Sequence, residues 1–193
     1  METNNESALE LLQLLELDRS ESPSLALLAL SDSKYLRDLK LNLKTVLKTD
    51  NLTEKEAGLI ALACSVNEKN QVLINYFATQ SKNLSATNEE ISETVACASL
   101  LSGNNVLYRF RHFTKKDKYQ QLQPRIRMSI MMNPILGKEL FELISLAVSA
   151  VNGCEMCVNS HEHSLMELGT SEERVFDAIK IASVITSYGK IIH

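Results

Sequence analysis

The segment GCEMCVNSHEH, residues 153–163, places two cysteines and two histidines within eleven positions, and the rest of the chain contains only two more of each. If a helix begins at the turn before Cys154, Cys157 lies about 60° from it around the helix axis, and His161 follows one turn after Cys157. Unpaired N–H groups and the helix dipole favour thiolates in a first turn, although Glu155 opposes a second negative charge there. The spacing therefore predicts a moderately activated pair of cysteines.

A carboxylate precedes this pair. Glu142 lies twelve residues before the first cysteine in an otherwise apolar run. Across the turn between two helices, it could hold the His161 imidazole in one tautomer and stabilise its charged form, which would leave a base or proton shuttle beside Cys157. The competing interpretation places Glu142 on a solvated face and His161 at the surface. We interpret His112 and His163 as surface or packing residues.

Two other chemistries compete for the same segment. Four zinc ligands could come from Cys154, Cys157, His161 and Glu142, although structural zinc sites usually draw on two well-separated ligand pairs on knuckles or loops. Covalent haem attachment needs a histidine directly after the second cysteine, and Val158 occupies that position.

The elements that position these side chains are expected to be helices. Apolar residues recur at spacings of three and four, and alternating strands bounded by hairpin turns are absent, so we predict an all-α fold. Two pairs have the spacing of capping boxes, namely Thr53 with Glu56 and Thr170 with Glu173. Three glycines are expected where helices stop or turn, namely Gly103, Gly153 and Gly169.

The chain also matches itself at an offset of 84 residues, where GLIALACS at 58–65 aligns with ELISLAVS at 142–149. The match predicts two related helical halves, a scaffold half at about 53–113 and a catalytic half at about 137–190, in a domain spanning 34–193. Only the second half carries the chemistry, because Glu142, Cys154, Cys157 and His161 correspond to Gly58, Asn70, Leu73 and Phe77.

Composition narrows the possible partners and surroundings. The net charge of −4 gives no general attraction to nucleic acid, and no apolar run approaches the roughly 20 residues that span a membrane. The leucine-rich residues 1–33, interrupted by acidic side chains, predict a helical extension packed on the body or on a neighbouring subunit rather than a secretion signal. We therefore expect a cytoplasmic protein, in which Cys64 and Cys97, in apolar helical runs, are buried and inert.

One segment has the opposite charge. Residues 109–127 contain seven lysines and arginines against one aspartate. Such a run is either a solvated face or a docking surface for an acidic lipoyl-bearing domain, and in the second case association would be sensitive to salt.

Four segments, YLRDLKLNL, NNVLYRFRHF, LQPRIRMSIMMNP and FELISLAVSAVNGCEMCVNSHEHSL, together closely resemble the alkyl hydroperoxide reductase AhpD family, within the broader carboxymuconolactone decarboxylase-like superfamily. The resemblance covers about residues 35–190 and includes the motif formed by Glu142, Cys154, Cys157 and His161. It implies an AhpD-like all-helical fold and a homotrimer.

The resemblance further implies a peroxidase or thiol–disulfide adaptor that binds no cofactor or metal of its own. It would take electrons from dihydrolipoyl groups on 2-oxoacid dehydrogenase components and pass them to the peroxiredoxin AhpC. Cys157 would be the peroxidatic cysteine, which becomes a sulfenic acid and forms the mixed disulfide with AhpC. Cys154 would be the proton donor and resolving thiol, and the two would close a disulfide. The helix dipole alone would favour Cys154 as the nucleophile, so this assignment depends on the family.

The chain departs from the family at Met156, where many members have a histidine, and in its first thirty or so residues. Two alternatives remain beside the redox interpretation. One is a decarboxylase-like member of the superfamily that acts on a small lactone or acid and needs no dithiol. The other is a non-catalytic helical oligomer with a structural zinc.

Overall fold

The computed structural model describes residues 5–17 and 22–193. Within them the chain forms ten α-helices and one short 3-10 helix and no strand, which confirms the predicted all-α fold. The elements are α1 (Glu6–Leu14), α2 (Pro23–Leu30), α3 (Tyr35–Val46), α4 (Glu54–Asn67), α5 (Gln71–Asn83), α6 (Asn88–Thr114), α7 (Asp117–Gln121), η1 (Ser129–Met131), α8 (Lys138–Val151), α9 (Glu155–Glu167) and α10 (Glu172–Gly189).

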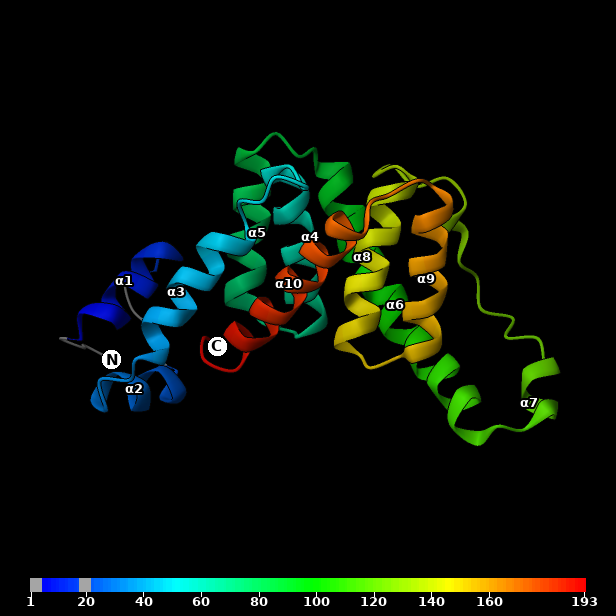
Figure 1. The fold of residues 1–193 in the computed structure, drawn as a ribbon, viewed down its shortest axis with the longest axis horizontal. Helices are drawn as coiled ribbons and strands as arrows, with labels where there is room; N and C mark the ends of the chain where they lie inside the picture. Colours follow the sequence, from blue (N-terminus) through cyan, green and yellow to red (C-terminus); the bar gives the residue numbers. More distant parts are fainter. Residues whose placement is uncertain (1–4, 18–21) are drawn as a thin grey trace.

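The two related halves are visible in the helix bounds. Helices α8, α9 and α10 each begin 84 residues after α4, α5 and α6, respectively. Helices α4 and α8 contact each other at the centre of the molecule, and α10 packs against both (Figure 1). The repeat in the sequence thus corresponds to a repeated unit of three helices.

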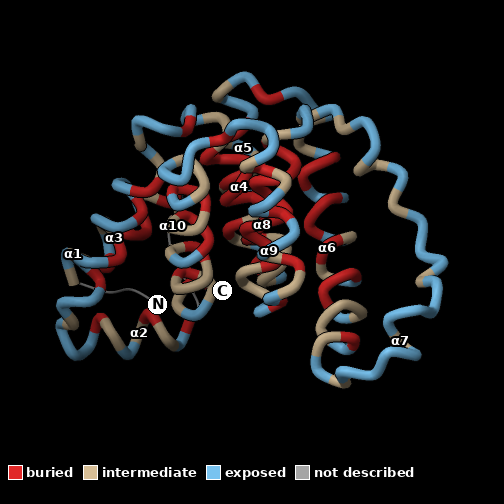
Figure 2. Tube along the Cα trace, turned by 45° about the vertical axis from the view of Figure 1, so that its right-hand side comes forward, coloured by how far each residue is buried: buried red, intermediate tan, exposed pale blue. Residues whose placement is uncertain are grey.

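The central helices form most of the core. Residues 57–65 of α4 and 140–149 of α8 are buried without a break, and both helices appear as buried segments in the middle of Figure 2. A helix that is apolar on nearly all sides must be covered on all sides, and their many alanines, serines and glycine let neighbouring helices approach closely. Glu142 therefore falls inside a buried helix rather than on a solvated one.

The predicted helix starts are partly confirmed. Thr53 and Glu56 form the expected capping box at α4. The second predicted box is wrong, because Ser171 rather than Thr170 caps α10. Thr170 instead donates its hydroxyl hydrogen bond to the Glu139 carboxylate at 3.0 Å. Two adjacent residues were both suitable caps, and the tertiary contact to α8 decided between them.

The predicted glycine positions are also partly confirmed. Gly153 and Gly169 follow α8 and α9 with φ of 64° and 80°, a conformation that favours glycine. The prediction for Gly103 is wrong, because it lies inside the 27-residue helix α6. A glycine costs a helix roughly 1 kcal/mol relative to alanine, and the contacts along α6 outweigh that cost.

The N-terminal residues form two helices rather than one. Within the described residues, α1 packs against α3, and α3 packs against α10 (Figure 1). Leu11 and Leu12 of α1 are buried, so the leucine pattern corresponds to an apolar face on the body. The predicted extension 1–33 includes residues 1–4 and 18–21, which lie outside the described residues, and its boundary stays a prediction.

At the opposite end, residues 109–137 form an arm. It comprises the last turns of α6, helix α7 and the segment that returns to α8, and it extends away from the helical body (Figure 1). No helix in the described part of the chain is long and apolar enough to cross a membrane.

Candidate redox site

A tight turn between α8 and α9 carries the two cysteines. Asn152 ends α8, Gly153 adopts the left-handed conformation, and Cys154 occupies the cap position of α9. The helix begins at Glu155, which places Cys157 in its first turn, while Cys154 lies just outside it. A disulfide joins the two sulfurs, with 5.2 Å between the Cα atoms. Both residues are buried, Cys154 completely and Cys157 with 6% exposed.

The structure brings Glu142 and His161 together. The Oε2 atom of Glu142 on α8 lies 2.6 Å from Nδ1 of His161 on α9. Both residues are less than 10% exposed, so the interpretation as surface residues is wrong. A buried carboxylate is costly unless it is paired, and the imidazole supplies the partner. With Nδ1 engaged, Nε2 is the ring nitrogen left for other groups.

A hollow of about 240 Å³ reaches the disulfide from one side. Its lining includes Cys157 and His161 but not Cys154. The other walls are largely apolar and come from α6, the arm and α9, and they include Tyr108, Met128, Met131 and Met156. A small molecule in this hollow would therefore meet the Cys157 sulfur rather than the Cys154 sulfur. Met156, the family departure, is part of the wall.

Several residues at this site were not predicted from the sequence. Tyr108, Met128 and Met131 come from distant positions and carry no spacing signal. Asn105 lies fully buried on α6, a helix with many polar residues, so nothing in the sequence set its side chain apart. It binds the turn before the cysteines through Asn152.

His112 and His163 lie outside this hollow, as expected of surface or packing residues. The side chain of His163 is 74% exposed and pairs with Glu167 one turn along α9. His112 of α6 lies 3.3 Å from Glu155 at the start of α9. Neither residue lines the hollow beside Cys157.

The other two cysteines are buried thiols, as predicted. Burial raises the pKa of Cys64 to about 12, and nearby Glu68 adds to the effect. Burial also raises the pKa of Cys97 to about 12, although a hydrogen-bonding contact with Ser145 acts in the opposite direction. Both thiols stay protonated at neutral pH, and a protonated thiol is a poor nucleophile.

The four side chains considered above as zinc ligands do not form a metal site. Among residues 5–17 and 22–193, no three His, Cys, Asp or Glu side chains lie close enough together to hold one metal ion. At the cysteine pair, both sulfurs are joined in the disulfide rather than directed at a shared centre. This arrangement of side chains gives the zinc alternative no geometric support.

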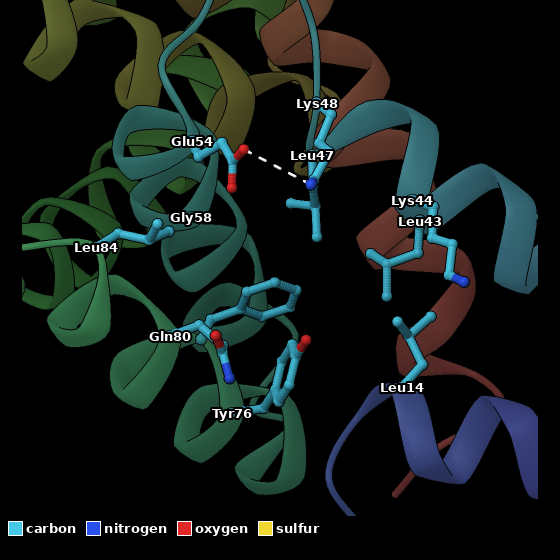
Figure 3. Close-up of a pocket in the computed structure, with 11 residues that line it drawn as sticks. Leu14, Leu43, Lys44, Leu47, Lys48, Glu54, Gly58, Tyr76, Gln80 and Leu84 are labelled. Atoms are coloured by element: carbon cyan, nitrogen blue, oxygen red, sulfur yellow. Dashed lines mark ion pairs between the residues drawn. The ribbon is translucent and has the colours of Figure 1, made fainter.

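A larger hollow, of about 450 Å³, lies in the first half between α3 and the α4–α5 pair. Figure 3 shows its lining, with Leu43 of α3 and Leu47, the residue after that helix, facing Gly58 and Tyr76 across the gap. Gly58 and Phe77, which also line it, correspond to Glu142 and His161 under the 84-residue offset. The first half thus repeats the helices, but Gly58 and Phe77 stand in place of the Glu142–His161 pair, and no cysteine is among the residues that line this hollow.

The seven cationic side chains of the basic segment 109–127 form two groups: two donate hydrogen bonds to backbone carbonyls, and five are exposed. Arg109 donates to the backbone carbonyl of Asn152 at 2.8 Å, and buried Arg111 donates to that of Leu122. The five remaining cationic residues of the segment are exposed on the arm, namely Lys115, Lys116, Lys118, Arg125 and Arg127. The arm therefore exposes five cationic side chains, and two of its other residues, Met128 and Met131, line the hollow at Cys157.

Comparison with known proteins shows relatives over most of the chain. The profile of the carboxymuconolactone decarboxylase family matches residues 117–193. The chain is 40% identical over 160 residues to the alkyl hydroperoxide reductase AhpD of Solibacter usitatus (strain Ellin6076), which covers 82% of this chain and 89% of the relative. Relatives with the same description occur in Anaeromyxobacter dehalogenans (strain 2CP-C), with 39% identity over 77% of this chain and 80% of the relative, and in Streptomyces griseus subsp. griseus, with 37% identity over 80% and 87%.

Proposed function

The chain belongs to the alkyl hydroperoxide reductase AhpD family, and from this premise we propose that it reduces hydroperoxides by cycling Cys154 and Cys157 between dithiol and disulfide. The observation that carries the proposal is a disulfide whose Cys157 end borders a hollow shared with His161. The chain binds no cofactor of its own in this scheme, and its electrons come from a dihydrolipoyl group on a partner protein.

The oxidising half begins at Cys157. Its thiolate attacks the terminal oxygen of the hydroperoxide, so that an S–O bond forms and the O–O bond breaks. The departing alkoxide takes a proton and leaves as the alcohol. His161 accepts the proton of the Cys157 thiol and delivers it to the leaving oxygen, while Glu142 stabilises the imidazolium form in between. Cys157 is then a sulfenic acid.

Cys154 resolves this intermediate. Its sulfur attacks the sulfur of the sulfenic acid, so that the S–S bond forms and the S–O bond breaks. The proton from Cys154 leaves with the hydroxyl group as water. The product is the Cys154–Cys157 disulfide.

The reducing half returns the dithiol. A dihydrolipoyl thiolate attacks the Cys157 sulfur and releases Cys154, and the second lipoyl thiol then displaces Cys157 and closes the lipoyl disulfide. The donor is a lipoyl-bearing component of a 2-oxoacid dehydrogenase. In the adaptor role, the reduced Cys157 attacks a disulfide of the peroxiredoxin AhpC and passes on the electrons through a mixed disulfide.

One observation supports Cys157 rather than Cys154 as the reacting thiol. Cys157 lines the hollow and Cys154 does not. The helix start does not separate the two, because Cys154 is at the cap of α9 and Cys157 is in its first turn, and the free N–H groups there favour a thiolate at the cap at least as much. The assignment to Cys157 therefore rests on its access to the hollow and on the family.

We further propose that the protein is a cytoplasmic homotrimer. The arm and the end of α6 expose apolar side chains that a neighbouring subunit would cover, among them Val106, Phe110 and Phe113 at helical spacing. Exposed apolar patches of this kind are typical of subunit interfaces. Light scattering on the purified protein measures the assembly directly, and a monomer at micromolar concentration would contradict the trimer.

The deciding experiment is a coupled turnover assay. Full-length protein, a lipoyl domain, dihydrolipoamide dehydrogenase and NADH are combined with an alkyl hydroperoxide, with and without AhpC. NADH consumption that requires both the protein and hydroperoxide supports direct peroxidase activity, and consumption that appears only with AhpC supports the adaptor role. No consumption in either case would overturn the proposal.

The family profile over 117–193 favours one second candidate, a decarboxylase-like activity on a small lactone or acid. That chemistry needs no dithiol. Replacement of both cysteines with serine would leave such an activity in place, whereas it would abolish the redox cycle.

A further inference from the structure

Three asparagines from different parts of the chain meet at the turn that precedes Cys154. The Asn152 side-chain amide donates to Oδ1 of Asn67 on α4 at 3.1 Å and to Oδ1 of Asn105 on α6 at 2.9 Å. Asn67 donates in return to Oδ1 of Asn152 at 3.0 Å. We refer to Asn67, Asn105 and Asn152 as the asparagine clamp.

Further hydrogen bonds connect the clamp to the backbone of the turn. Arg109 donates to the Asn152 carbonyl at 2.8 Å. Asn105 donates to the Ser149 hydroxyl at 3.0 Å, and the Ser149 carbonyl accepts the Cys154 backbone N–H at 3.0 Å. The backbone on both sides of Gly153 is therefore held by α4, α6 and α8 and not by α9 alone.

The clamp fixes the turn through geometry rather than charge. Amides do not titrate. Each asparagine of the clamp both donates and accepts a hydrogen bond. Asn105 is fully buried, so loss of a partner would leave an unsatisfied amide and cost stability. Because Cys154 belongs to this turn while Cys157 belongs to α9, the clamp controls the position of one sulfur relative to the other.

We propose that the asparagine clamp sets the reduction potential of the Cys154–Cys157 pair, with its three members as positioning residues. A thiol that stays close to its partner after reduction has a high effective concentration, which favours reclosure of the disulfide. A turn released from the clamp would let Cys154 sample other positions, and the disulfide would become easier to reduce. This inference rests on the proposed redox function and adds to it a device outside the cysteine motif.

The test measures the reduction potential of full-length Asn152→Ala protein in glutathione buffers of defined ratio, with the disulfide fraction read from the mass of alkylated protein. We expect the equilibrium constant for disulfide formation to fall about tenfold, which makes the potential about 30 mV less negative. The matched control is Asn159→Ala, an exposed asparagine on α9, which should keep the wild-type potential.

A double-mutant cycle assigns the effect to the clamp. Asn67→Ala should shift the potential in the same direction, and the combined variant should shift it by less than the sum, because both changes remove the same hydrogen bonds. If Asn152→Ala does not fold, Ser102→Ala provides the milder variant, since its hydroxyl donates to Asn67 at 2.8 Å from the edge of the clamp.

Folded clamp variants with the wild-type potential would overturn the inference, as would additive shifts. Failure of the proposed function has a different signature. Wild-type protein would then show a reversible disulfide with a measurable potential but no hydroperoxide-dependent turnover.

Discussion

His161 Nδ1 lies 2.6 Å from Glu142 Oε2, a contact between the buried helix α8 and the cysteine-bearing helix α9 that packs on it. A carboxylate accepts a hydrogen bond from an imidazole N–H, so Glu142 assigns the proton to Nδ1 and leaves Nε2 as the base of the neutral ring. His161 and Cys157 line the same hollow. The proposed proton transfer at Cys157 depends on this pair.

Glu142→Gln should lower peroxidase turnover by about 10² to 10⁴-fold, because an amide cannot stabilise the imidazolium that forms during proton transfer. Steady-state rates in the coupled assay measure the effect. Turnover by His161→Gln should fall to a similar level. Both variants should keep the wild-type circular dichroism spectrum. His163→Gln, at an exposed position on the same helix, is the control. Wild-type rates for Glu142→Gln and His161→Gln would show that no such relay operates.

The two cysteines should behave differently after peroxide treatment. Cys154→Ser should accumulate a sulfenic acid at Cys157, because the sulfur that lines the hollow remains while the resolving thiol is gone. A dimedone-type reagent followed by peptide mass spectrometry detects it. Cys157→Ser should give no label. A label on Cys154 in that variant, with none on Cys157 in the reciprocal one, would reverse the two roles and leave the redox function intact.

Cys64 and Cys97 should not react with alkylating reagents in the folded protein. Burial raises the pKa of each to about 12, so the thiolate fraction at pH 8 is on the order of one part in 10⁴. Because the shift is upward, reactivity should appear only as the pH approaches that value. Native alkylation of reduced protein at pH 8 should label neither Cys64 nor Cys97, and alkylation in guanidinium should label both. Native labelling of Cys64 would contradict the buried assignment.

The exposed cations of the arm provide a test of partner docking. Lys118→Glu combined with Arg127→Glu should weaken binding of an acidic lipoyl domain by roughly tenfold at low ionic strength, and wild-type binding should weaken as salt is added. Calorimetric titration of the full-length protein measures both. Lys82→Glu on α5 of the first half is the control for Lys118→Glu alone, because it makes the same charge change at an exposed lysine away from the arm. If neither added salt nor the double substitution changes the binding affinity, the basic segment 109–127 is a solvated face.

Arg174 should contribute to stability in a pH-dependent way. It lies 2.5 Å from Glu56 on α4 and 2.9 Å from Glu139 on α8. Burial alone would raise the pKa of Glu56, but hydrogen bonds from Arg174 and Thr53 outweigh it and lower the pKa. The carboxylate therefore stabilises the fold above its ordinary pKa, and this contribution is lost as pH falls through the lowered value.

Arg174→Met should accordingly lower the free energy of unfolding by about 1 to 3 kcal/mol at pH 7, because charged partners lose their hydrogen bonds. The difference from wild type should shrink at acidic pH, where Glu56 is protonated in both proteins. Urea unfolding at several pH values measures it. A difference that stays constant down to pH 3 would attribute the loss to packing of the arginine side chain instead.

The sequence by itself determined the helices, the 84-residue repeat and the identity of the four motif residues. These features depend on spacing along the chain: apolar residues three and four apart define a helical face, and Cys157 and His161 are neighbours on any helix that contains both. The sequence did not predict the correct helix cap where two adjacent residues were almost equally suitable, as with Thr170 and Ser171 at the start of α10.

Only the tertiary structure decided which side chains from other elements reach the cysteines. The contact between Glu142 and His161 depends on how α8 packs on α9, and the approach of Asn67 and Asn105 to Asn152 depends on α4 and α6 as well. Such contacts arise from the relative placement of whole helices, which many core residues set together and no single spacing records. The proposed chemistry of the cysteine pair therefore rests on a short segment, whereas the positions of its side chains depend on the folded core.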